Sequence, residues 1–279
     1  MNINSNKYTF IYAVVMVVIV AVILSLAATS LAPKQDENVR IEKMQNILRA
    51  IAPEGEDVKD NEDEKLKSFR KEDVIVLYNS NIAEEMTVNT KGETVNIFDV
   101  KMEKFTQGSG RRAFDIDVKE QLEIIRKEGD GLLPVFVYQN RCITKYVIPL
   151  YGTGLWGAIW GNLALSGDLN VIQGAIFDHK GETPGLGSDI ATTNFAAKFR
   201  GKKLFDEQGN IQKFRLVKGG ATGTLTPTPS NAIDALSGAT LTSEGVQNMI
   251  NDCIGYYKPW ILNTKIKLQN EKDIFQSVK

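Results

Sequence analysis

Cysteine and histidine are nearly absent from this 279-residue sequence, which has 2 cysteines and 1 histidine. A structural zinc site needs about four closely grouped ligands. Cys142, Cys253 and His179 cannot supply one, so no metal site is expected. The cysteines could form a disulfide in an oxidising compartment, although two free thiols are the commoner outcome, and the sequence leaves this open.

An excess of positive charge is also lacking, since 33 basic residues stand against 34 acidic ones and the net charge is -1. Nucleic acid is bound through a strong positive field. No nucleic-acid partner is therefore expected.

One long segment carries no charge at all, because residues 8–32 are 25 uncharged and mostly apolar residues. At ~1.5 Å per residue a helix of this length spans a hydrocarbon core of roughly 30 Å. We predict a transmembrane helix over 8–32 rather than a cleaved signal peptide, whose apolar core is only about 7 to 15 residues long. Lys7 in the segment 1–7 favours a cytoplasmic N-terminus, with the rest of the chain on the other side of the membrane.

Residues 33–72 have the opposite composition, with 20 charged residues in 40. This stretch is too polar to form a core of its own, so we predict a charged stalk. Apolar residues recur at helical spacing from about 39 to 52, which predicts an amphipathic helix that ends at Pro53. We expect this helix to pack on the chain's own globular domain rather than on a partner protein.

Beyond residue 72, short apolar runs alternate with Gly, Asn and Asp, as is typical of strands. The runs of strand length are 73–78, 94–100, 133–139, 142–151 and 170–177, and helical periodicity marks 119–127, 192–199 and 243–257. Because strands and helices come in blocks rather than in strict alternation, we predict an α+β fold with a mixed or antiparallel sheet. One globular domain over 73–262 and a polar, exposed or frayed tail over 263–279 complete the predicted organisation.

A G-x-G-x-x-G pattern formed by Gly152, Gly154 and Gly157 follows a strand-like run. A dinucleotide-binding unit needs a full crossover helix after these glycines, and residues 158–165 leave room for barely two turns. Two other interpretations remain open. The glycines could let a flat aromatic ligand approach the backbone beside apolar side chains, or they could bend a strand that packs its tryptophans in the core, which is the stronger interpretation from these residues alone.

Residues 179–187 contain Pro184 and three glycines, which predict a rigid, tightly turned loop with exposed amide donors. Such a loop can hold the polar edge of a ligand. His179 could act as a general base or a proton carrier, but a lone histidine at a strand end is more often a hydrogen-bonded structural residue. No catalytic residue is predicted, since no nucleophile has an evident base.

Residues 234–244 combine small residues with hydroxyls and lead into the predicted helix 243–257. Thr242 or Ser243 can cap this helix, and the free amides and positive dipole end suit a phosphate. From spacing alone, a capped helix start is the stronger interpretation. A hydroxyl beside a phosphate site is the alternative.

Residues 237–243 resemble the flavinylation motif of membrane redox proteins that carry FMN phosphoester-linked to a threonine. Residues 182–187 and 154–161 resemble two further signatures of those FMN-binding domains. With the N-terminal anchor, nearly the whole chain resembles the C-subunit family of sodium-translocating NADH:quinone reductases. The G-subunit family of the Rnf ferredoxin:NAD oxidoreductases shares the flavin motif, but its members are typically shorter and lack the tryptophan-rich stretch.

This resemblance implies that Thr240 carries the FMN phosphate, installed by a separate flavin transferase. The residues implied around the cofactor are Ser237, Gly238, Ala239, Leu241, Thr242, Leu155, Trp156, Glu182 and Thr183. The implied function is an electron relay in a complex that couples NADH oxidation by quinone to sodium export, without an NADH site in this chain. The implied partners are the other subunits of the complex and membrane lipid, with the globular domain on the periplasmic side of a bacterial inner membrane. An Rnf-type G subunit and a non-redox membrane-anchored binding module are the alternatives.

Overall fold

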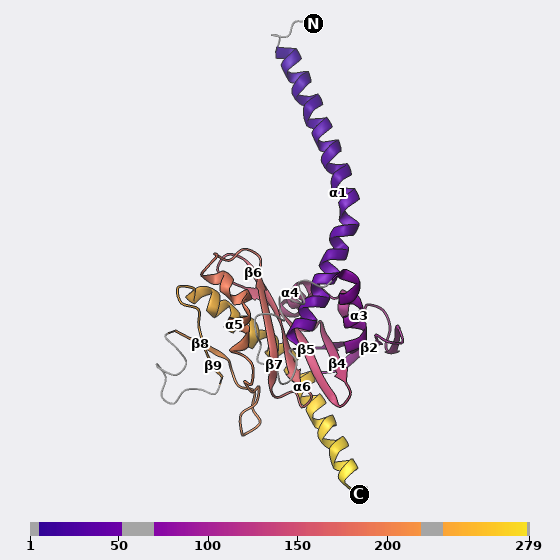
Figure 1. Cartoon of the computed structure of the whole chain (residues 1–279), viewed down its shortest axis with the longest axis vertical. Helices are drawn as coiled ribbons and strands as arrows, with labels where there is room; N and C mark the ends of the chain where they lie inside the picture. The colour runs from indigo at the N-terminus through magenta and orange to yellow at the C-terminus, as the bar shows by residue number, and fades with distance from the viewer. Residues whose placement is uncertain (1–5, 52–69, 219–230, 278–279) are drawn as a thin grey trace. The chain divides into compact units, whose positions relative to one another are not determined.

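The computed structural model describes residues 6–51, 70–218 and 231–277, and Figure 1 shows the chain. The predicted helix end at Pro53 and most of the predicted stalk lie outside the described residues. The chain divides into two compact units, Met1–Lys43 and Met44–Lys279. The second unit contains the sheet and the candidate site.

Helix α1 (Asn6–Ala50) is continuous through Pro33. An 18-residue stretch of it has a mean hydropathy of 3.0 and no part of that stretch is buried. Within the described part of the chain, α1 is the one helix that is long and apolar enough to cross a membrane. At its other end, Ile47 and Ala50 are buried in a core cluster of the globular unit. For residues 44–51, the predicted packing of the amphipathic stretch on the chain's own domain is therefore confirmed.

The globular unit is built on a seven-stranded sheet in the order β3-β2-β1-β4-β5-β6-β7. The strands are β1 (Ile82–Asn89), β2 (Thr94–Asp99), β3 (Lys104–Gln107), β4 (Leu132–Asn140), β5 (Ile143–Thr153), β6 (Ala158–Ser166) and β7 (Ile172–His179). All neighbouring pairs are antiparallel. Strands β8 (Arg215–Val217) and β9 (Ala232–Asp234) form a separate parallel pair. The predicted α+β class with a mixed or antiparallel sheet is confirmed.

The buried residues form two clusters, one on each face of this sheet. In β5, Val147 and Ile148 are adjacent but belong to different clusters, and the same holds for Ala164 and Leu165 in β6. Successive strand side chains point to opposite faces, so the two clusters lie on opposite sides of the sheet. The alternation produces a fold of three layers, with helical segments above and below the sheet.

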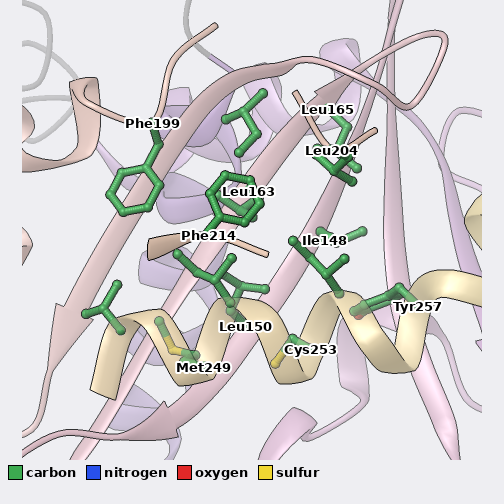
Figure 2. Packing of buried hydrophobic residues seen from close by; sticks show 14 of the residues in the cluster. Ile148, Leu150, Leu163, Leu165, Phe199, Leu204, Phe214, Met249, Cys253 and Tyr257 are labelled. Carbon is green, nitrogen blue, oxygen red and sulfur yellow. The ribbon is translucent and has the colours of Figure 1, made fainter. Parts of the chain in front are cut away.

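Different helices cover the two faces. The larger cluster includes residues of α4 (Val118–Glu128), α5 (Thr193–Ala197) and α6 (Thr240–Ser277), and the smaller one includes residues of α3 (Lys71–Asn81), the 3-10 turn η1 (Ala113–Asp115) and the end of α1. Figure 2 shows α6 lying along the sheet face that carries the larger cluster, with Met249, Cys253 and Tyr257 directed toward the strands. The Tyr257 hydroxyl donates to the carbonyl oxygen of Pro134 in β4 at 2.7 Å.

The predicted strand over 73–78 is wrong, because these residues lie in α3. Val74 and Tyr78 are four residues apart and fully buried, whereas Val76 between them is exposed. That spacing buries one face of a helix. The β-branched run favours a strand locally, and packing of a single face against the sheet overrides that preference.

Helix α6 is longer at both ends than the predicted helix 243–257. It begins at Thr240 and continues through Pro259 to Ser277. The tail after Trp260, for which the sequence predicts exposure or fraying, is helical as far as Ser277. Ile266 and Ile274 within it are exposed.

Candidate functional site

The G-x-G-x-x-G segment forms the turn between β5 and β6. The Gly154 N–H donates to the carbonyl oxygen of Gly157 at 2.8 Å, and a strand follows where a crossover helix would be needed. This geometry excludes a dinucleotide-binding unit at this position. The expectation of a core tryptophan fails here too, since Trp156 is 68% exposed and its neighbour Leu155 is also exposed.

The loop after β7 turns back tightly on itself. The N–H groups of Leu186 and Ser188 both donate to the carbonyl oxygen of Thr183, each at 3.1 Å. Gly185 has a φ of +71°, a conformation that suits glycine. The loop leaves Thr183 and Leu186 exposed but buries Glu182, which is only 4% exposed. The predicted tight turn is confirmed, and Leu186 adds an exposed apolar side chain outside the predicted set of site residues.

The flavin-like motif forms the start of α6. Thr240 is the first helical residue, and the Ser243 N–H donates to the Ala239 carbonyl oxygen at 2.9 Å. The amides of the first helical residues have no carbonyl partner within the helix, and the helix dipole adds positive potential there. Thr240 and Leu241 are exposed beside these amides. An exposed hydroxyl therefore stands at a helix end that favours a phosphate.

Thr242 and Ser243 do not cap this helix, contrary to the prediction. Thr242 Oγ1 donates to Glu182 Oε2 at 2.7 Å. Ser243 Oγ accepts the Leu236 N–H at 3.0 Å, which fixes the turn that precedes the helix. Both side chains are buried, and the helix begins after Ala239, which has no side chain able to cap it.

Glu182 joins three segments that are distant in sequence. Its Oε1 accepts the Trp156 N–H at 2.9 Å, and its Oε2 accepts the Thr242 hydroxyl. A buried carboxylate is stable only when hydrogen bonds replace its water. Glu182 therefore holds the β5–β6 turn, the loop after β7 and the first turn of α6 together.

Three glycines leave room for the junction of these three segments around Glu182. A Cβ on Gly154 would lie 2.5 Å from Glu182 Oε1, and one on Gly187 would lie 2.6 Å from both Glu182 Oε2 and Thr242 Oγ1. A Cβ on Gly245 would lie 2.5 Å from the carbonyl oxygen of Thr153. The sequence predicts a turn that includes Gly187, but it indicates neither close contact at Gly187 nor the one at Gly245, because the neighbouring atoms come from other parts of the chain.

His179 has a structural hydrogen bond in this junction. Its Nδ1 accepts the Glu182 N–H at 3.2 Å, which orients the backbone that carries the buried carboxylate. The interpretation of His179 as a hydrogen-bonded structural residue is confirmed.

The predicted site residues meet at one end of the domain. Gly238 has a φ of +75°, and its Cβ position lies 2.8 Å from Leu186 Cδ2, so the flavin-like motif contacts the loop after β7. The exposed large apolar side chains of these segments are Leu155, Trp156, Leu186 and Leu241. Together with the Thr240 hydroxyl and the free helix amides they suit a ligand with a phosphate at one end and a flat apolar ring at the other. FMN has this chemistry.

Comparison with known proteins agrees with this site. Residues 154–255, which contain all three segments, match the FMN-binding domain family. The C subunit of the Na(+)-translocating NADH-quinone reductase of Vibrio campbellii is 31% identical over 262 residues, covering 91% of this chain and 92% of that protein. The chain belongs to this C-subunit family. The Pseudomonas aeruginosa member is 28% identical over 267 residues, covering 91% of this chain and 93% of that protein.

Solved structures from the C-subunit family have the same fold. The crystal structure from Parabacteroides distasonis has a TM-score of 0.65 at 31% identity and covers 83% of this chain and 96% of that one. The structure from Shewanella oneidensis has a TM-score of 0.58 at 24% identity, covering 81% and 98%, and shows the likeness of fold. The chain thus has an FMN-binding domain and an N-terminal membrane anchor. Neither the Rnf-type G subunit nor a non-redox binding module is favoured by these relatives.

Proposed function

We propose that this chain is a flavin-carrying electron relay within a sodium-translocating NADH:quinone reductase. It passes electrons between other redox centres of that complex, so that NADH oxidation by quinone is coupled to sodium export. The observation that carries the proposal is the exposed Thr240 hydroxyl at the start of α6, surrounded by exposed apolar side chains within the FMN-binding domain. The start of α6 suits the phosphate of FMN, and the exposed apolar side chains suit its ring.

Thr240 is the proposed point of covalent attachment. Its hydroxyl loses a proton as Oγ1 bonds to the phosphorus of FMN, and the diphosphate bond of a flavin dinucleotide donor breaks to release a nucleoside monophosphate. A separate flavin transferase supplies the base in this scheme, because the buried carboxylate of Glu182 is hydrogen-bonded to Thr242 instead. The free amides and helix dipole stabilise the phosphate once it is in place.

The remaining site residues cover and orient the cofactor. Leu155, Trp156 and Leu241 offer apolar surface to the ring, and Thr183 offers a hydroxyl beside it. Ser237, Gly238 and Ala239 shape the turn before the attachment point. When bound, FMN supplies the redox chemistry, whereas the chain supplies the tether, orientation and electrostatic surroundings. A covalent tether prevents loss of the cofactor to dilute solution, where a reversibly bound flavin would dissociate by mass action.

The globular unit is proposed to face the periplasm of a bacterial inner membrane. Lys7 precedes the apolar stretch of α1, and positive charge tends to remain on the cytoplasmic side. The other subunits of the complex and membrane lipid are the proposed partners of the anchored chain. A reporter enzyme that works only in the cytoplasm, fused after residue 279, tests this orientation. We expect the fusion to be inactive, and an active fusion would place the globular unit in the cytoplasm.

Intact mass spectrometry of the full chain, expressed with its flavin transferase, tests the attachment. We expect an increment equal to esterified FMN, located by peptide mapping at Thr240 and absent from Thr240→Ala. Thr106→Ala is the control, since Thr106 is an exposed threonine of β3, outside the motif, and should not be required for the bond. An unmodified wild-type chain, or an increment that persists in Thr240→Ala, would rule out the proposed linkage.

A further inference from the structure

The motif at the start of α6 contains four hydroxyl groups that differ in accessibility: Ser237, Thr240, Thr242 and Ser243. The first two are exposed, whereas Thr242 is 1% and Ser243 is 2% exposed. Their spacing does not separate them, since all four are close together on the chain, and only the family resemblance points to Thr240. The fold selects which of these hydroxyls a large donor can reach.

Thr242 is the strongest chemical competitor of Thr240. Its hydroxyl donates to a carboxylate, Glu182 Oε2, at 2.7 Å, which is the arrangement of a nucleophile beside a base. However, both side chains of the pair are buried, so a flavin nucleotide cannot reach Thr242. In this geometry the carboxylate holds the Thr242 hydroxyl inside the domain instead of activating it.

Glu182 is itself fixed from several directions. Its second oxygen accepts the Trp156 N–H at 2.9 Å, and its own N–H donates to His179 Nδ1 at 3.2 Å. The absence of side chains at Gly154 and Gly187 leaves the space that the carboxylate occupies. A carboxylate fixed in this way fixes in turn the position of Thr242 and the first turn of α6.

We propose that Glu182 is a positioning residue that holds Thr242 inside the domain and thereby presents the Thr240 hydroxyl as the acceptor of the flavin phosphate. This inference rests on the proposed function, in which Thr240 carries FMN. Glu182 makes no bond to the phosphate in this scheme. It sets the fraction of chains in which the helix start has the geometry that the transferase recognises.

This role has a kinetic signature. If the transferase binds only chains with the correct helix start, lowering their fraction raises the apparent KM for the chain and leaves kcat at saturation nearly unchanged. A residue that takes part in phosphoryl transfer would instead lower kcat. The ratio of the two effects separates positioning from catalysis.

The experiment uses the full chain with FAD and a flavin transferase, and follows the flavin increment by intact mass and peptide mapping. We expect Thr242→Val and Glu182→Ala to raise the KM by roughly tenfold, the size expected from loss of a hydrogen bond to a buried charge. Thr242→Ser keeps the hydroxyl and should restore the wild-type KM. Glu244→Gln is the matched control, since it removes an exposed carboxylate from the same helix turn and should leave the KM unchanged.

A further variant tests the burial of Thr242 without changing Glu182. In Thr240→Ala we expect no flavin at Thr242, and a flavin mapped there would overturn the proposal. A wild-type KM in folded Thr242→Val and Glu182→Ala, a fall in kcat alone, or failure of Thr242→Ser to restore the KM would also overturn it. Thermal melting shows whether Thr242→Val and Glu182→Ala are folded at the assay temperature. If both are unfolded, Glu182 serves stability only and the proposal is overturned. A wild-type chain that takes up no flavin would instead defeat the proposed function.

Discussion

Gly245 of α6 packs directly against the backbone of Thr153 at the end of β5. A Cβ at position 245 would lie 2.5 Å from the Thr153 carbonyl oxygen and 3.1 Å from the Cα of Gly154. Both neighbours are backbone atoms, which cannot swing away as a flexible side chain can. The first turns of α6 can therefore approach the β5–β6 turn only because residue 245 has no side chain.

We expect Gly245→Ala to destabilise the domain by about 1–3 kcal/mol, the usual cost of overpacking, although alanine is the better helix former. The matched control is Gly255→Ala in the same helix, where a Cβ would meet nothing within 4 Å. That variant should gain about 0.5–1 kcal/mol from helix propensity. Chemical denaturation of the two variants measures the difference, and equal effects would show that the contact with Thr153 is unimportant.

The buried carboxylate of Glu85 gives a second prediction. It accepts from Arg112 Nη2 at 2.6 Å, from the Tyr78 hydroxyl at 3.0 Å and from the Phe114 N–H at 3.2 Å. Arg112→Ala leaves this charge buried without its cation, and we expect a loss of about 3–5 kcal/mol. Denaturant titration provides the measurement.

Arg111→Ala is the control for Arg112→Ala. Arg111 pairs with Glu120 at 3.8 Å, and both side chains are largely exposed. Exposed pairs of this kind contribute about 0–1 kcal/mol, so the variant should be close to wild type. If the two variants lost similar amounts of unfolding free energy, burial of the Glu85 carboxylate would not explain the effect of Arg112→Ala.

The α+β class and several elements were predictable because their patterns are local, whereas β1, β3 and β6 have no counterpart among the predicted strands. The α4 helix over Val118–Glu128 has a capping Asp117, whose side chain accepts the Lys119 N–H, and a left-handed Gly129 at its other end. Both signals are visible in the sequence. Thr94–Asp99 similarly has strand-forming residues between turn residues. By contrast, the local pattern of α3 favours a strand, because its helical burial depends on the sheet beneath it.

The candidate site was predictable as three motifs but not as one structure. Trp156, Glu182 and Thr242 are separated by 26 and 60 positions, and only the folded sheet brings them within hydrogen-bonding distance. The burial of Thr242 likewise depends on a distant carboxylate. The sequence could therefore indicate a hydroxyl beside a phosphate-binding helix end, but not that the fold exposes Ser237 and Thr240 and buries Thr242 and Ser243.

Glu84 gives a prediction about pH. It is half-buried in β1 and pairs across the sheet with Asp99, and the pKa of Glu84 is raised first by burial and then by the Asp99 charge. Because the pKa of Glu84 is higher in the folded chain than in the unfolded chain, its protonated carboxyl contributes fully to stability below the unfolded-state pKa. This contribution is lost as the pH rises through the folded-state pKa. At pH 7 the charged Glu84 is therefore unfavourable.

We expect Glu84→Gln to raise the melting temperature at pH 7, and the gain should shrink as the pH approaches about 3, where the wild-type carboxyl is protonated. Glu123→Gln on the exposed side of α4 is the control and should change little. Thermal melts across this pH range make the measurement. A gain that is the same at pH 3 and pH 7 would not arise from the charge of Glu84.

The two cysteines are free and should react very differently with alkylating reagents. Cys142 is exposed, whereas Cys253 is buried and burial raises its pKa to about 12. The thiolate is the reactive form, and at pH 8 a pKa of about 12 leaves about one thiolate in 10⁴ at Cys253, before the lack of access is counted.

We expect one fast alkylation per native chain, its loss in Cys142→Ser, and a second alkylation only after unfolding. Raising the pH to about 9 should leave Cys253 unreactive, because that pH is still far below its pKa. Two fast thiols in the native chain would show that α6 opens from the sheet at Cys253, whereas no free thiol in the unfolded, unreduced chain would show that the two cysteines are paired.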